Sequence, residues 1–94
     1  MFIFTLTYIK PISEVEKYLQ QHIAYLEDYY QSGHFIASGR KVPRTGGVIL
    51  CRAENKEQAL AILQKDPFYI QQIAEYDIIE FVPSKYAKDF EVFI

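Results

Sequence analysis

Two polar residues, His22 and Asp66, stand where the surrounding pattern favours buried apolar side chains. His22 belongs to the series Val15, Leu19, His22, Leu26 and Tyr29, whose spacing of three or four residues places all five on one helix face. Asp66 opens the turn Asp66-Pro67-Phe68 at the end of a second helical segment. Because burial of an imidazole is costly without a hydrogen-bonding partner, we expect a polar group from elsewhere in the chain opposite His22.

The chemistry open to such a pair is acid-base catalysis. A carboxylate that reaches an imidazole nitrogen fixes the tautomer of the ring and raises its basicity, as in a general acid-base pair. Each residue also has a structural interpretation. A core histidine can be satisfied by a carbonyl group, and an aspartate before proline commonly binds nearby backbone groups in a turn.

Composition limits the kinds of protein and partner that are expected. The chain has 94 residues, of which half are hydrophobic and 16% aromatic, so we expect a single domain. Because the net charge is −2, we expect no nucleic-acid partner. Cys51 is the only cysteine, so we expect no intrachain disulfide and a reduced, cytoplasmic location. We expect neither export nor a membrane partner, because there is no leader-like segment and no apolar run of about 18 residues.

Local patterns predict the order of the elements. Strands are expected at residues 2–9, 34–39, 48–51 and 76–82, because these runs are β-branched, aromatic or apolar. The pairs Ser13 with Glu16 and Asn55 with Gln58 resemble capping boxes, so one helix is expected from Ser13 to Gly33. A second is expected from Asn55 to the Asp66-Pro67 step, which terminates it. A helical turn is expected at residues 67–73. The segment from Ser84 to Ile94 is a C-terminal tail that either adds a strand or covers a neighbour.

The order β-α-β-β-α-β predicts a ferredoxin-like α+β sandwich, in which a four-stranded antiparallel sheet carries both helices on one face. In this topology the end of the second helix can approach the middle of the first, which favours a contact between Asp66 and His22. The first strand is apolar on both faces, and such strands are usually covered on both. We therefore expect a homodimer that packs through the face without helices; the alternative is a monomer whose aromatic sheet face contacts water.

Several segments together carry a resemblance to a known family. They are Gln21 to Leu26, Ser32 to Phe35, Ala37 to Gly39, Gly46 to Ile49, and Lys65 to Phe68. In this order they resemble the YCII-related (YciI-like) family over residues 2 to 82, and Asp66-Pro67-Phe68 after a short Ala-containing helix is the most specific segment. Two positions depart from the family pattern. Gln20 and Gln21 stand where an arginine or proline commonly precedes the histidine, and Arg40 replaces a frequent proline.

The resemblance implies a dimeric ferredoxin-like fold, related to the dimeric α+β barrels, with a His-Asp pair in a pocket near the dimer cleft. By position His22 and Asp66 are that pair. Ser38 and Gly39 would line the pocket, together with Pro67 and Phe68 as substrate-binding residues. One type of member in this family eliminates chloride from a chlorinated hydroxyquinol.

Two functions of different classes remain open. The first is a small enzyme without a cofactor, in which His22 is the acid or base, Asp66 orients it and Ser38 binds a small, possibly aromatic substrate. Its reaction would be isomerisation, elimination or hydrolysis. The second is a non-catalytic homodimer that binds a small molecule in the same pocket. A haem-dependent activity is less favoured, and two histidines with one cysteine give no metal-ligand spacing.

Overall fold

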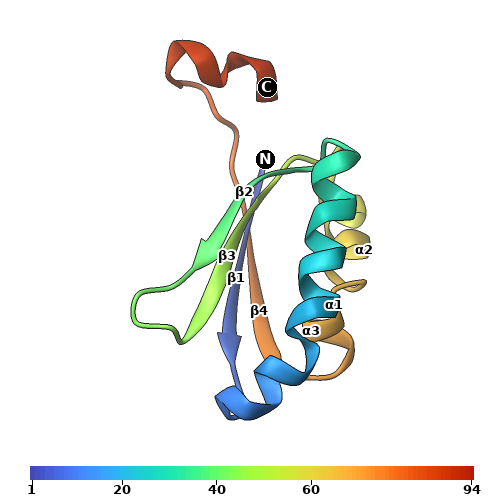
Figure 1. The fold of residues 1–94 in the computed structure, drawn as a ribbon. Coiled ribbons are helices and arrows are strands. Elements are labelled where there is room, and N and C mark those ends of the chain that lie inside the picture. Colours follow the sequence, from blue (N-terminus) through green and yellow to red (C-terminus); the bar gives the residue numbers. More distant parts are fainter.

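The computed structural model describes all 94 residues as four strands, three α-helices and one 3-10 helix (Figure 1). In chain order the elements are β1 (Phe2–Tyr8), α1 (Ile12–Gln31), β2 (Phe35–Arg40), β3 (Gly46–Cys51), α2 (Lys56–Leu63), α3 (Pro67–Ile70), β4 (Ala74–Glu80) and η1 (Lys88–Phe93). The predicted β-α-β-β-α-β order is confirmed. The helical turn expected after Asp66 is the short helix α3, and β4 begins two residues earlier than predicted.

The four strands form one antiparallel sheet in the order β2-β3-β1-β4, which is the ferredoxin-like arrangement. Each strand pairs only with antiparallel neighbours because the two helical connections skip over one strand. In the register, Phe4 lies opposite Ile49 and Ile78. Strand alternation then directs Phe2, Phe4 and Leu6 to one face and Ile3 to the other.

The three α-helices cover one face of the sheet (Figure 1), and the core lies between these two layers. Fourteen buried apolar residues form this core, with Phe2, Phe4 and Leu6 from β1 at its centre. Burial of each large apolar side chain contributes about 1.5–3 kcal/mol. Cys51 is also fully buried, and this burial raises the pKa of its thiol to about 11. It is a small core residue, as its apolar surroundings in the sequence predict.

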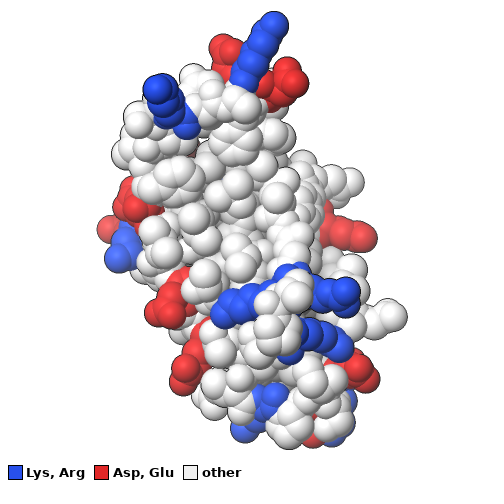
Figure 2. Space-filling model, turned by 90° about the vertical axis from the view of Figure 1, so that its left-hand side faces the viewer, with Lys and Arg blue, Asp and Glu red and all other residues white.

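The opposite face of the sheet carries no helix and is partly apolar. Ile3 lies opposite Leu50 and Ile79 on this face, and the side chain of Ile79 is 52% exposed. Figure 2 looks onto this side of the molecule and shows a broad region without charged side chains. Within the single chain this surface has no cover.

The start of α1 differs from the prediction. The helix begins at Ile12 with Pro11 as N-cap, and no side chain caps it. The backbone N–H groups of Glu14 and Val15 bind the carbonyl of Pro11, so Ser13 already lies inside the first turn. The predicted Ser13 capping box is therefore wrong. By contrast, Asn55 caps α2 as predicted, because its side-chain oxygen accepts the N–H of Gln58 at 2.8 Å.

The C-terminal tail leaves the sheet at Pro83 and ends in η1, above the body of the domain in Figure 1. The side chains of Val92 and Ile94 in this tail are 72% and 51% exposed. An additional strand, one of the two roles expected for the tail, is not formed. A proline ends the extended run from β4, and Phe90 packs instead on Phe93 within the tail.

Candidate active site

His22 lies in the middle of α1 on the face that packs against the sheet. Its neighbours in the apolar series are all buried or half-buried, and its own side chain is only 12% exposed. The ring of Phe68 stacks on the imidazole, with centroids 4.1 Å apart and planes 6° from parallel. This stacking fixes the orientation of the ring from one side.

Asp66 reaches His22 from the N-terminus of α3, although 44 residues separate the two in the chain. The Asp66 side chain is fully buried, and its Oδ1 lies 2.8 Å from Nδ1 of His22. The same oxygen accepts the backbone N–H of Phe68 at 2.9 Å, so Asp66 is also the N-cap of α3. The carboxylate thus starts a helix and orients an imidazole with one oxygen.

Tyr76 is a third member of this cluster and was missed in the sequence analysis. Its hydroxyl donates a hydrogen bond to Oδ2 of Asp66. Burial, and then the nearby Asp66 charge, raises the pKa of Tyr76 well above its ordinary value, so the hydroxyl keeps its proton and remains a donor. The only available signal was strand alternation, which places Tyr76 on the same face of β4 as Ala74 and Ile78.

The hydrogen bonds define which nitrogen of His22 is available. An ionised carboxylate can only accept, so Nδ1 of His22 carries the hydrogen that binds Asp66. The other nitrogen, Nε2, then has a free lone pair. This is the tautomer that a general base requires, and Asp66 would also stabilise the imidazolium formed when Nε2 takes a proton.

His22 lines a cavity of about 380 Å³ between α1 and the hairpin formed by β2 and β3. The size is at the lower end of the range for small-molecule sites. The walls are largely apolar. They are formed by Leu6, Tyr8, Leu19, His22, Ile23, Leu26, Ser38, Gly39, Arg40, Arg44, Gly46, Gly47, Val48, Ile49 and Phe68.

Ser38 and Gly39 both line this cavity. A register shift between Phe35 and Ala37 acts as a β-bulge, which changes the face to which later residues of a strand point. Ser38 consequently lies opposite Ile49, on the helix side of the sheet. Its Oγ is 2.6 Å from the hydroxyl of Tyr30, so α1 holds this serine in place.

The glycine pair at the start of β3 has a packing role beside the cavity. A Cβ atom at Gly46 would lie 1.7 Å from the carbonyl oxygen of Leu6 in the neighbouring strand. Only glycine permits the two backbones to approach so closely. The sequence pattern predicts a hairpin turn at Gly46-Gly47, whereas both glycines already belong to β3 in the structure.

Of the two remaining residues predicted to bind substrate, Phe68 lines the cavity and Pro67 does not. Pro67 is the first residue of α3, where its fixed φ suits the start of a helix. It lies instead with Gln21 and Lys65 on the outer surface. Asp66 also does not line the cavity, since it sits behind His22.

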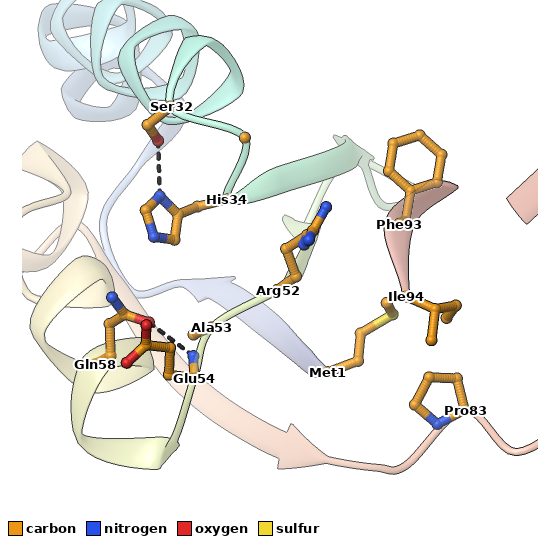
Figure 3. A pocket seen from close by; sticks show the side chains of 11 residues that line it. Met1, Ser32, His34, Arg52, Ala53, Glu54, Gln58, Pro83, Phe93 and Ile94 are labelled. Atoms are coloured by element: carbon orange, nitrogen blue, oxygen red, sulfur yellow. Dashed lines mark hydrogen bonds between the residues drawn. The ribbon is translucent and has the colours of Figure 1, made fainter. Parts of the chain in front are cut away.

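A second cavity, of about 540 Å³, lies at the other end of the sheet beneath the C-terminal tail (Figure 3). Figure 3 shows His34 and Arg52 on one side of this cavity and Phe93 and Ile94 of the tail on the other. The Nδ1 atom of His34 lies 2.7 Å from Oγ of Ser32. None of the residues predicted to form the functional site lines this cavity.

The structure contains no cluster of potential metal ligands and no candidate membrane-spanning helix. No group of three or more His, Cys, Asp or Glu side chains is placed to hold a metal ion. None of the helices combines the length and the apolar character needed to cross a bilayer.

The contribution of Tyr76 can be measured directly. We expect Tyr76→Phe to lower the free energy of unfolding by about 1–3 kcal/mol, because the buried Oδ2 of Asp66 loses its donor. Urea unfolding followed by circular dichroism measures this change. Tyr69→Phe is the matched control, since Tyr69 is exposed, and we expect a change within about 0.5 kcal/mol. Equal effects of the two substitutions would contradict this role.

The fold and the cluster together define a small ferredoxin-like α+β protein with a hydrogen-bonded His-Asp pair at a cavity. The model of the YCII-related domain family matches residues 1–82, and the chain belongs to this family. The match ends where the tail begins. No curated protein matches the sequence.

Among solved structures, the fold is similar to that of 5-chloro-2-hydroxyhydroquinone dehydrochlorinase (TftG) from Burkholderia phenoliruptrix AC1100, determined in complex with 2,5-dihydroxybenzoquinone. The TM-score is 0.72 over 95% of this chain and 98% of that chain. Sequence identity is 17%, so this similarity establishes the fold. The predicted ferredoxin-like class is confirmed.

Proposed function

We propose that this protein is a small cytoplasmic enzyme that needs no cofactor and performs acid-base chemistry on a small aromatic molecule. The observation that carries the proposal is the hydrogen bond between His22 and the buried Asp66. It occupies Nδ1 and leaves Nε2 as the nitrogen available to a ligand. Family membership supports small-molecule enzymology, since a structural neighbour is named for acting on a chlorinated aromatic compound.

In this proposal His22 removes a proton from the substrate through Nε2. The electron pair of the broken bond to hydrogen forms a new double bond. This expels a leaving group, for example chloride, from the adjacent carbon. Alternatively, the proton returns to another atom and the product is an isomer. Hydrolysis would use the same base to activate water. Asp66 stabilises the transient imidazolium, and Ser38 donates a hydrogen bond to a substrate oxygen.

The shape and composition of the cavity support a small planar substrate. The Phe68 ring already stacks on His22 and packs edge-on against Tyr8 at a centroid distance of 6.0 Å. Flat aromatic walls favour a flat ligand.

The single reduced cysteine supports a reducing compartment, and hence the cytoplasm.

A non-catalytic small-molecule-binding protein is the second candidate. The observation in its favour is that Asp66 also caps α3 and accepts a hydrogen bond from Tyr76. A buried carboxylate with these structural partners does not require catalysis to explain it. In this case the cavity would hold a metabolite without changing it.

Turnover assays distinguish the two candidates. A panel of hydroxylated and chlorinated quinols would be incubated with the wild-type protein and with His22→Ala, and products would be followed by absorbance and chloride release. We expect turnover by the wild type and none by the variant. Binding without turnover of any compound, measured by calorimetry, would favour the binding protein.

We also propose that the chain forms a homodimer through the sheet face without helices. The support is the apolar strip that includes Ile3 and Ile79 on this face, which solvent would otherwise contact. By covering the strip, a second copy would bury apolar surface on both chains.

Light scattering tests the proposed dimer. We expect a mass twice that of the 11.0 kDa chain, and we expect Ile79→Lys to reduce it to the single-chain value, because a charge would be buried in the interface. Ile70→Lys is the control, since Ile70 is 60% exposed on α3, away from the sheet. A wild-type mass of one chain would exclude this interface.

A further inference from the structure

Two arginines are the charged side chains that line the His22 cavity. Arg40 ends β2 and Arg44 lies in the hairpin loop that follows, and both face the cavity opposite α1. No carboxylate lines this cavity. The nearest, Asp66, is fully buried behind the imidazole.

Neither arginine is neutralised by a strong partner. Arg40 is exposed and forms no ion pair within the chain. Nη1 of Arg44 lies 3.7 Å from Oε1 of Glu16, too long for a good hydrogen bond, and exposed pairs of this kind contribute little. Two guanidinium groups are therefore available at the cavity.

From this arrangement we propose that the ligand of the His22 cavity is a planar organic acid whose carboxylate binds Arg40 and Arg44. The guanidinium fork matches a carboxylate with two parallel hydrogen bonds. The apolar walls around Leu19 and Phe68 would contact the uncharged ring of the same molecule. His22 would then face the ring, while the arginines hold the acid group.

This inference rests on the proposed function only in taking the His22 cavity as the ligand site. It adds a substrate class that the family resemblance does not supply, because Gln20 and Gln21 stand where an arginine or proline commonly precedes the family's histidine. In this chain the positive charge enters from the β2–β3 hairpin instead.

The test compares gentisate, a dihydroxybenzoate, with its neutral amide, which has the same ring and hydroxyl groups. Calorimetry at low salt measures both affinities for the full chain. We expect gentisate to bind at least about tenfold more tightly, since a charge-assisted hydrogen bond is stronger than a neutral one. We also expect this preference to shrink at high salt because the arginines are exposed.

Variants assign the preference to the two arginines. Arg40→Gln and Arg44→Gln should each weaken gentisate binding about tenfold and leave amide binding nearly unchanged. Lys41→Gln is the matched control, because it removes the same charge from the same hairpin. Lys41 binds Thr7 Oγ1 at 3.0 Å and does not line the cavity.

Three results would overturn the inference. They are equal affinity for acid and amide, no gentisate binding at millimolar concentration, or equal losses in the Lys41 and arginine variants. The proposed function can fail separately. Binding of gentisate without turnover of any aromatic acid would leave the arginine site standing, whereas His22-dependent turnover of neutral quinols without acid preference would do the opposite.

Discussion

We expect Asp66→Ala to lower the free energy of unfolding by about 3–5 kcal/mol, because a buried hydrogen-bond network loses its shared acceptor. Three donors lose their acceptor together: Nδ1 of His22, the N–H of Phe68 and the hydroxyl of Tyr76. Each unsatisfied buried group costs about 1–3 kcal/mol, and loss of the N-cap adds to the effect.

This loss is large for a domain of this size, because total stabilities are about 5–15 kcal/mol. Urea unfolding at one fixed protein concentration measures it, since an oligomer would make the result concentration-dependent. Asp28→Ala is the control, as Asp28 is exposed on α1 and forms no ion pair within the chain. Asp66→Asn should be milder than Asp66→Ala because the amide oxygen can still cap α3. A loss below about 1 kcal/mol for Asp66→Ala would contradict the role of this carboxylate.

The second large effect is expected on catalysis. His22→Ala should reduce kcat/KM for the substrate by about 100- to 10,000-fold, the usual contribution of a general acid or base. The fold should persist, because Asp66 keeps its hydrogen bonds to Phe68 and Tyr76. His22→Gln provides a second variant, whose amide can still donate to Asp66, in case alanine disturbs the stacking with Phe68.

The pH profile separates a catalytic role from a structural one. With His22 as the base, activity of the wild type should fall as the imidazole is protonated, and this acidic limb should disappear from the residual activity of His22→Gln. His34→Ala is the matched control, because His34 lies at the second cavity beneath the tail. Residual activity within tenfold of wild type, with an unchanged pH profile, would exclude His22 as the acid or base.

Sequence reasoning recovered the parts of the fold that neighbouring residues encode. The spacing of apolar residues in α1 placed His22 on the inner face, and the pair Asn55 and Gln58 marked the start of α2. The Asp66-Pro67 step marked the start of α3 for a local reason also, since proline suits the first helical position. The Ser13 capping box failed because the carbonyl of Pro11 starts α1 two residues earlier.

The contact between Asp66 and His22 was predicted from topology, but its details were not accessible. The chain order indicates that α3 lies near α1, whereas the third partner, Tyr76, comes from a strand at the sheet edge. Its hydroxyl meets Asp66 only after β1 and β4 are paired in register. Although only ten residues separate Asp66 from Tyr76, their contact depends on strand pairing, which has no signature in the local sequence.

By itself, then, the sequence determined the order of the elements, the inward face of α1 and the two residues suited to acid-base chemistry, because each depends on residues close together in the chain. Only the tertiary structure decided what surrounds them. The bulge in β2 directs Ser38 to the cavity, and the hairpin brings Arg40 and Arg44 opposite His22. These placements depend on strand register and on packing between layers, which no local pattern specifies.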